Sequence, residues 1–187
     1  MIGLHNKQIH TEKAFTLVEL LVVCGIFSTI VIVIVSIFVS LIQLQKNILL
    51  TKKALGEANY ALEFMSRALR MAEKELTEGG ECIPFGENYQ PIYGNQGIRF
   101  KNGNEGGECQ EFYLENGQIK FKRPGKPPLA LTSPATKISQ LQFLLQGESQ
   151  TDQIQPLVTI VFTVELEQFQ PLKFQTSISQ RNLDVVY

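Results

Sequence analysis

Glu19 has the most unusual chemical setting of any residue in this 187-residue chain. It lies in the stretch KAFTLVELLVV, Lys13–Val23, and directly precedes an apolar run, Leu20–Ile42, that contains no charged residue. By insertion scales, a charge near the centre of a bilayer costs on the order of 2.5–3.5 kcal/mol. Glu19 therefore needs either a partner of opposite charge or a position at the membrane interface, where a carboxylate near a helix N-terminus also suits the helix dipole.

The residues that form common catalytic and metal sites are scarce. Both histidines, His5 and His10, precede the apolar run, so the remaining chain lacks the usual catalytic base and metal ligand. We find no glycine-rich phosphate loop, CxxC, HExxH or nucleophile elbow. Three carboxylates lie close together in a glycine-rich stretch: Glu105, Glu108 and Glu111. They could bind calcium, but their spacing is not that of an EF-hand. A solvated acidic loop is the favoured interpretation. We expect no enzymatic activity, no cofactor and no metal ion.

The three cysteines fall in two different settings. Cys24 lies inside the apolar run, where a thiol behaves as a small apolar group. Cys82 and Cys109 lie in the polar part of the chain and could pair if that part faces an oxidising compartment. Two unrelated free thiols are the alternative.

A group of basic residues is interleaved with aromatic residues in the middle of the chain. The basic residues are Arg99, Lys101, Lys120, Lys122, Arg123 and Lys126. In a hairpin, Lys120 and Lys122 share the face opposite Ile119 and Phe121, and they are the candidate contacts for DNA. The net charge of −1 argues against a general basic surface, and a charged outer face of a sheet is the favoured interpretation.

The apolar run is long enough to cross a membrane. Its 23 residues would extend about 34 Å as a helix, against a hydrocarbon core of about 30 Å. A cleaved signal peptide has a shorter apolar core and a small-residue cleavage site after it, which this run lacks. Lys7 and Lys13 precede the segment, and Lys46, Lys52 and Lys53 follow it. Because lysines flank both ends, the positive-inside rule does not orient the segment.

Beyond the membrane segment, apolar residues at spacings of three and four predict an amphipathic helix over residues 43–78, with Gly79-Gly80 as its stop. The stripe consists of Leu55, Ala58, Leu62, Met65, Leu69, Ala72 and Leu76.

Alternating apolar residues predict an antiparallel sheet over about residues 98–180. It would contain a short strand at Ile98–Phe100 and a hairpin of Glu111–Leu114 and Gln118–Lys122 around the Asn116-Gly117 turn. Three further strands are expected around Leu141–Leu145, Val158–Leu166 and Leu172–Ile178.

The N-terminal segment resembles the type IV prepilin family, which includes type IV pilins and the pseudopilins of type II secretion and competence. The shared pattern is a short polar leader, then Phe-Thr-Leu-Val-Glu-Leu, then some twenty apolar residues. The resemblance implies a leader Met1–Ala14, cleavage between Ala14 and Phe15 by a prepilin peptidase, and methylation of the new Phe15 amine. It also implies that Glu19 pairs with the amine of a neighbouring subunit during assembly. Ala14 stands where the family usually has Gly.

The resemblance implies an α+β, pilin-like fold in three parts: the leader 1–14, a membrane and assembly helix 15–42, and a soluble domain 43–187. The segments ALEFMSRALRMA and QTSISQRN look like those of J-type minor pseudopilins and W-type minor pilins. The implied function is a minor pilin or pseudopilin, a single-pass inner-membrane protein with its C-terminal domain outside the cytoplasm. Its partners would be related subunits, the assembly platform and lipid. A DNA- or surface-binding minor pilin at the fibre tip, and a signal-anchored protein of unrelated function, are the alternatives.

Overall fold

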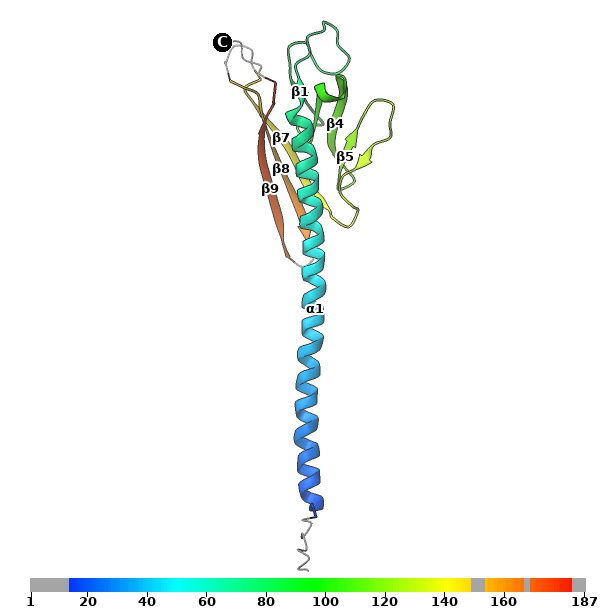
Figure 1. Ribbon diagram of the computed structural model, residues 1–187, viewed down its shortest axis with the longest axis vertical. Helices are drawn as coiled ribbons and strands as arrows, with labels where there is room; N and C mark the ends of the chain where they lie inside the picture. Colours follow the sequence, from blue (N-terminus) through cyan, green and yellow to red (C-terminus); the bar gives the residue numbers. More distant parts are fainter. Residues whose placement is uncertain (1–13, 149–153, 167–168, 183–187) are drawn as a thin grey trace, which may run out of the picture. The chain divides into compact units, whose positions relative to one another are not determined.

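The computed structural model describes residues 14–148, 154–166 and 169–182, and it combines one long helix with two antiparallel sheets (Figure 1). Helix α1 (Leu17–Arg70) has 54 residues. The chain divides into two units, one ending at Lys46 and one beginning at Asn47. The second unit contains the end of α1 and both sheets. The predicted α+β class is confirmed, and the architecture is pilin-like.

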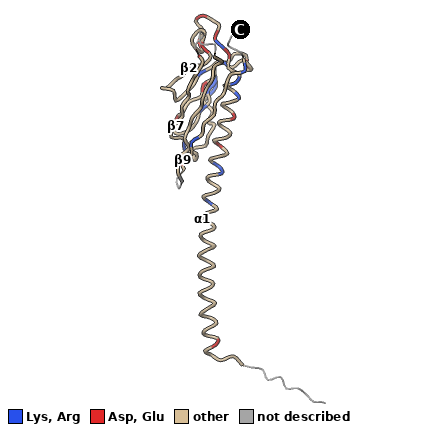
Figure 2. Tube along the Cα trace, turned by 90° about the vertical axis from the view of Figure 1, so that its left-hand side faces the viewer, with Lys and Arg blue, Asp and Glu red and all other residues tan. Residues whose placement is uncertain are grey.

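The part of α1 in the first unit exposes its apolar side chains. Glu19 is its only acidic residue, and no basic residue interrupts it before Lys46 (Figure 2). The hydroxyl groups in this stretch bond to carbonyls of their own helix, as Ser28 Oγ does to the Cys24 oxygen at 2.7 Å. Such bonds satisfy polar groups where no water is present.

Sheet A contains six strands in the second unit. They are β1 (Ala72–Glu73), β2 (Tyr89–Ile92), β3 (Gly97–Asn102), β4 (Glu108–Glu115), β5 (Gln118–Lys122) and β6 (Leu129–Ala130). The main strand order is β1-β3-β4-β5-β6, and β2 also pairs with β3. The 3-10 helix η1 (Gly103–Glu105) connects β3 to β4.

Sheet B contains three strands in chain order. They are β7 (Ile138–Gln146), β8 (Leu157–Leu166) and β9 (Phe169–Ser179). The alternation predicted for this part of the chain is confirmed on β8, where Val158, Ile160, Phe162 and Val164 are buried. The single sheet expected over residues 98–180 is in fact two.

The second half of α1 packs on both sheets through a row of small residues. Ala54, Ala58 and Ala61 are buried, and Met65 and Leu69 continue the row. Alanine side chains allow the helix backbone to lie close to the strands. The predicted stripe is therefore correct at its centre, while Leu55 and Leu62 lie half-buried at its edge.

Aromatic rings join the helix to sheet A. The rings of Phe112 and Phe121 stack at 5.1 Å between centroids, and Phe64 of α1 meets Phe121 edge-on at 5.1 Å. Such pairs add about 0.5–1.5 kcal/mol beyond burial of their surface.

The predicted helix end at residue 78 is wrong, because α1 ends at Arg70. The last carbonyls of a helix have no partner within it, and here other segments bond to those of Leu69 and Arg70 and to the next carbonyl, that of Met71. Tyr89 Oη donates a hydrogen bond to the Leu69 carbonyl oxygen at 2.9 Å. The Arg181 N–H donates to the Arg70 oxygen at 2.7 Å, and the Gly103 N–H donates to the Met71 oxygen at 3.0 Å. The next residues form β1, and Leu76, predicted to be buried, is 73% exposed.

The predicted hairpin is confirmed. Strands β4 and β5 pair around Asn116 and Gly117, whose φ angles are 52° and 71°. Both residues tolerate positive φ, as this type of turn requires.

Glu57 joins α1 to the loop that precedes β7. Its Oε2 accepts a hydrogen bond from the Ser133 N–H at 2.8 Å. Burial raises the pKa of Glu57, but the hydrogen bonds from the Ser133 backbone and the Thr136 hydroxyl outweigh burial, and the net pKa is lowered. The contact is therefore a pH-dependent contribution to stability.

We expect Glu57→Gln to lower the free energy of unfolding at pH 7 by about 0.5–1.5 kcal/mol, the usual value of one hydrogen bond. Because the folded-state pKa lies below the unfolded value of 4.5, the carboxylate contributes fully above that pH, and its contribution disappears as pH falls through the folded-state pKa. Urea unfolding at several pH values tests this. An unchanged difference between the two proteins from pH 7 down to acid pH would contradict it.

Candidate functional site

The sequence predictions place one candidate site at the start of α1. Ala14 and Phe15 precede the helix in exposed, irregular backbone. Thr16 is the residue before the first helical position, and its Oγ1 accepts a hydrogen bond from the Glu19 N–H at 3.2 Å. The bond of the predicted cleavage therefore lies just outside the helix, in exposed backbone.

Thr16 is a residue that the sequence analysis missed. Threonine followed three residues later by glutamate, before an apolar run, is the capping-box pattern, in which the threonine side chain bonds to the third helical N–H. That pattern was the signal that could have identified it. The cap fixes the point at which the helix begins, and it places the exposed Glu19 carboxylate in the first turn, near the partial positive charge of the helix N-terminus.

The apolar part of α1 is long and apolar enough to cross a membrane, and its most apolar stretch is not buried against the rest of the protein. A membrane anchor and a signal sequence share these properties. Among the described residues of this part, Glu19 is the charged group that such a segment would carry into or beside lipid.

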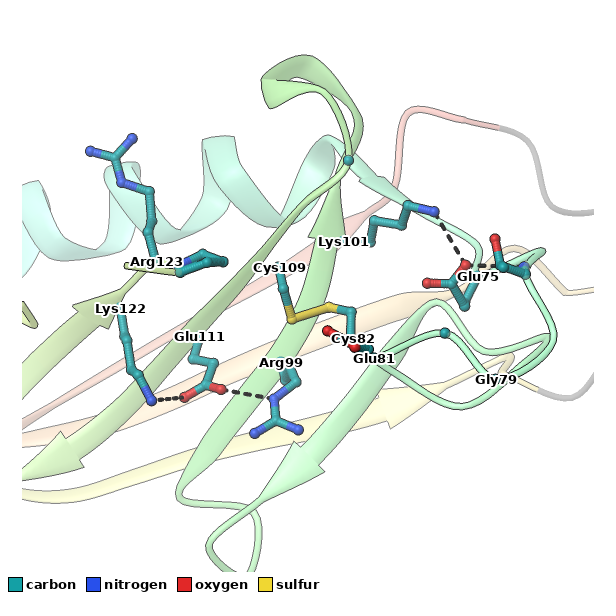
Figure 3. A pocket seen from close by; sticks show the side chains of 14 residues that line it. Glu75, Gly79, Glu81, Cys82, Arg99, Lys101, Cys109, Glu111, Lys122 and Arg123 are labelled. Atoms are coloured by element: carbon teal, nitrogen blue, oxygen red, sulfur yellow. Dashed lines mark hydrogen bonds and ion pairs between the residues drawn. A yellow bond between two sulfur atoms is a disulfide. The ribbon is translucent and has the colours of Figure 1, made fainter. Parts of the chain in front are cut away.

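A second region with chemical potential surrounds the disulfide on sheet A. Cys82 and Cys109 are bonded, with their Cα atoms 5.4 Å apart, so the pairing left open by the sequence is present. The bond ties the loop of residues 74–88 to β4 (Figure 3). Disulfides are typical of oxidising compartments, which indicates an extracytoplasmic domain. Cys24 is a free, exposed thiol on α1.

Glu75 organises that loop from inside. Its Oε1 accepts hydrogen bonds from the Thr77 N–H at 3.1 Å and from Lys101 Nζ at 3.2 Å. The Thr77 bond lowers the pKa of Glu75, burial opposes this, and Lys101 lowers the pKa further, so that the net pKa is lowered. A Cβ on Gly80 would lie 2.7 Å from the Glu75 carboxyl carbon, so a larger residue there would force the Glu75 side chain to shift.

Lys120 and Lys122, the candidates for DNA contact, lie on β5 on the outer face of sheet A, and most of the basic residues near them are paired. Glu111 accepts a hydrogen bond from Arg99 Nε at 2.8 Å, and its other oxygen lies 3.8 Å from Lys122 Nζ. Lys120 donates to Gln118 at 3.0 Å. The structure thus brings Lys122 together with Arg99 and Lys101 around buried carboxylates, rather than along an open basic strip with Lys120.

The three acidic residues considered for calcium do not share a site. Glu105 accepts hydrogen bonds from Gln110 at 3.0 Å and Arg123 at 3.1 Å. Glu111 is engaged by Arg99, and Glu108 is exposed. Within residues 14–148, 154–166 and 169–182, no three acidic, histidine or cysteine side chains are placed to hold a metal ion.

The leader residues before Ala14 lie outside the described part of the chain. Comparisons of the sequence with protein-family models, with curated proteins and with solved structures each found no match.

Proposed function

We propose that this chain is a minor pilin or pseudopilin, a structural subunit that assembles into a pilus-like fibre after its leader is removed. The observation that carries the proposal is a single carboxylate, Glu19, in the first turn of α1, whose residues 17–45 are exposed, largely apolar and otherwise uncharged. The pilin-like combination of this helix with antiparallel sheets supports it. Within the family, we favour a minor subunit of the J-type or W-type branch.

The mechanism begins with insertion of α1 into the membrane. A prepilin peptidase then cuts between Ala14 and Phe15, which creates a new amine with an unperturbed pKa near 8, and the amine is methylated. The α1 helices of related subunits pack side by side through their exposed apolar surfaces. No catalytic group of this chain takes part, and we propose that the protein is not an enzyme.

Glu19 fixes the axial position of one subunit relative to its neighbour. In a medium of low dielectric constant, a carboxylate and an ammonium group attract each other strongly, while either one alone is costly to bury. A subunit that is displaced along the fibre axis would leave Glu19 without the Phe15 amine of its neighbour. Correct pairing therefore favours one axial position.

The direct test is the mass of the chain extracted from membranes of cells with an active prepilin peptidase. We expect a mature protein that begins at Phe15 and carries one methyl group, and we expect the full precursor in cells whose peptidase is inactive. Ala14→Leu should cause the precursor to accumulate, because a bulky residue replaces the small one before the cut. Ala14→Gly, which restores the usual residue of the family, is the matched control and should be processed at least as well as the native chain. Retention of Met1–Ala14 in both cell types would refute the proposal.

A further inference from the structure

A charged pocket lies on the outer face of sheet A, against the disulfide-tethered loop of residues 74–88 (Figure 3). Its volume of about 670 Å³ is in the range of sites for small ligands. Its four cations are Arg99, Lys101, Lys122 and Arg123. Its three carboxylates are Glu75, Glu81 and Glu111.

Three of these cations are more exposed than the carboxylates that hold them. The fourth, Arg123, pairs with Glu105, which does not line the pocket, and its guanidinium lies over the Phe121 ring. The side chains of Arg99 and Lys122 are 32% and 47% exposed, whereas Glu111 between them is 10% exposed. Lys101 is 25% exposed and its partner Glu75 is 5% exposed. The two buried carboxylates therefore fix Arg99, Lys101 and Lys122 from below, and a ligand that enters the pocket meets the cations before the carboxylates beneath them. Glu81, which is exposed, is the exception.

Lys122 has hydrogen-bonding capacity that its ion pair does not use. Its Nζ lies 3.8 Å from Glu111 Oε2, which is too long for a hydrogen bond. That oxygen is buried and accepts no hydrogen bond from the described residues. The ammonium group is thus held near the pocket by charge alone, with its donors available to an acceptor inside.

The character of the remaining lining narrows the class of ligand. Among the described residues that line the pocket, none is aromatic, and several are glycine or proline. A site that binds nucleobases usually offers aromatic rings for stacking. A pocket whose more exposed ion-pair members are cations suits a compact, hydrophilic anion instead, since arginine and lysine both donate hydrogen bonds to carboxylate and phosphate oxygens.

We propose that this pocket binds an oxyanion, that is, a carboxylate or phosphate group, either free in solution or carried by an acidic sugar. Arg99, Lys101 and Lys122 would donate to its oxygens, and the disulfide would hold the loop that forms one wall of the site.

The test is isothermal titration calorimetry on the full chain in neutral detergent and a phosphate-free buffer at low ionic strength. Sodium phosphate and a galacturonate trimer serve as probes in separate titrations. We expect saturable binding of at least one probe, and about tenfold weaker binding to Lys122→Gln, the loss expected for one charge-assisted hydrogen bond. Lys126→Gln removes a neighbouring charge that does not line the pocket, and it should bind like the native chain.

A second variant acts in the opposite direction. Glu81→Gln removes the exposed carboxylate and should strengthen binding by about two- to fivefold, the effect of one like charge at the surface. Tighter binding of the trimer than of phosphate would identify an acidic sugar as the source of the group, and equal binding would identify the free anion; both support the site. No saturable binding of either probe, or equal affinity of Lys122→Gln and Lys126→Gln, would overturn it.

Discussion

Replacement of Glu19 by valine is expected to leave the protein in the membrane and correctly processed, but to reduce its incorporation into fibres by about a hundredfold or more. Removal of one partner from a buried ion pair costs about 3–5 kcal/mol because the other charge is left alone, and 1.4 kcal/mol corresponds to a factor of ten. Insertion should be unchanged or improved, since the substitution removes a charge from the head of the apolar run.

The measurement compares the amount of each variant in sheared fibres with the amount in membranes, normalised to the mature protein. Thr16→Val is the matched control, because it removes the hydroxyl that bonds to the Glu19 N–H and retains the carboxylate. Loss of a helix cap costs about 1 kcal/mol, so we expect a much smaller effect on assembly. If Thr16→Val impairs incorporation as severely as Glu19→Val does, the start of the helix matters and charge pairing does not.

Loss of the Cys82–Cys109 disulfide is expected to have the largest effect on stability. The bond joins residues 27 apart in the sequence, and the chain-entropy model assigns such a loop about 3–4 kcal/mol. The double variant Cys82→Ser/Cys109→Ser should therefore unfold roughly 6–16 °C lower, given a shift of about 2–4 °C per kcal/mol for a domain of this size. The loop of residues 74–88 should also become sensitive to protease, although the Glu75–Lys101 pair remains.

Thermal unfolding followed by circular dichroism, together with limited proteolysis, checks this expectation. Cys24→Ser serves as the control, because it removes the exposed free thiol of α1 and should leave the transition unchanged. Reduction of the native protein should reproduce the double variant. A double variant that unfolds at the native temperature would show that the loop is held by Glu75 and its neighbours without help from the disulfide.

Local patterns made several elements predictable. The Asn116-Gly117 turn could be predicted from two adjacent residues that accept positive φ. Strand β8 could be predicted from its alternating apolar residues, because these residues face the core. The buried face of α1 was predicted correctly, but not every residue at its centre. Leucine and alanine residues both lie on that face, and the spacing alone does not show which of them are most buried. Alanine occupies the centre at residues 54, 58 and 61, where the strands lie close.

The candidate sites divide in the same way. Glu19 was identifiable because a carboxylate before 23 uncharged residues is costly wherever the chain folds. The charged pocket was not identifiable, because Glu75, Lys101 and Glu111 belong to segments that pair only in the folded domain. Read along the sequence, the basic residues formed a patch. The structure shows that Arg99 and Lys122 share one buried carboxylate.

The sequence by itself determined where the chain is apolar enough for a membrane, where its one charge in that stretch lies, and which later segments alternate as strands. These features depend on side-chain type and on spacing within one element. Only the tertiary structure decided that α1 ends at Arg70, that the strands form two sheets and that Cys82 meets Cys109. Each of these outcomes depends on hydrogen bonds or contacts between residues far apart in the chain, and no local pattern encodes which distant partner will be present.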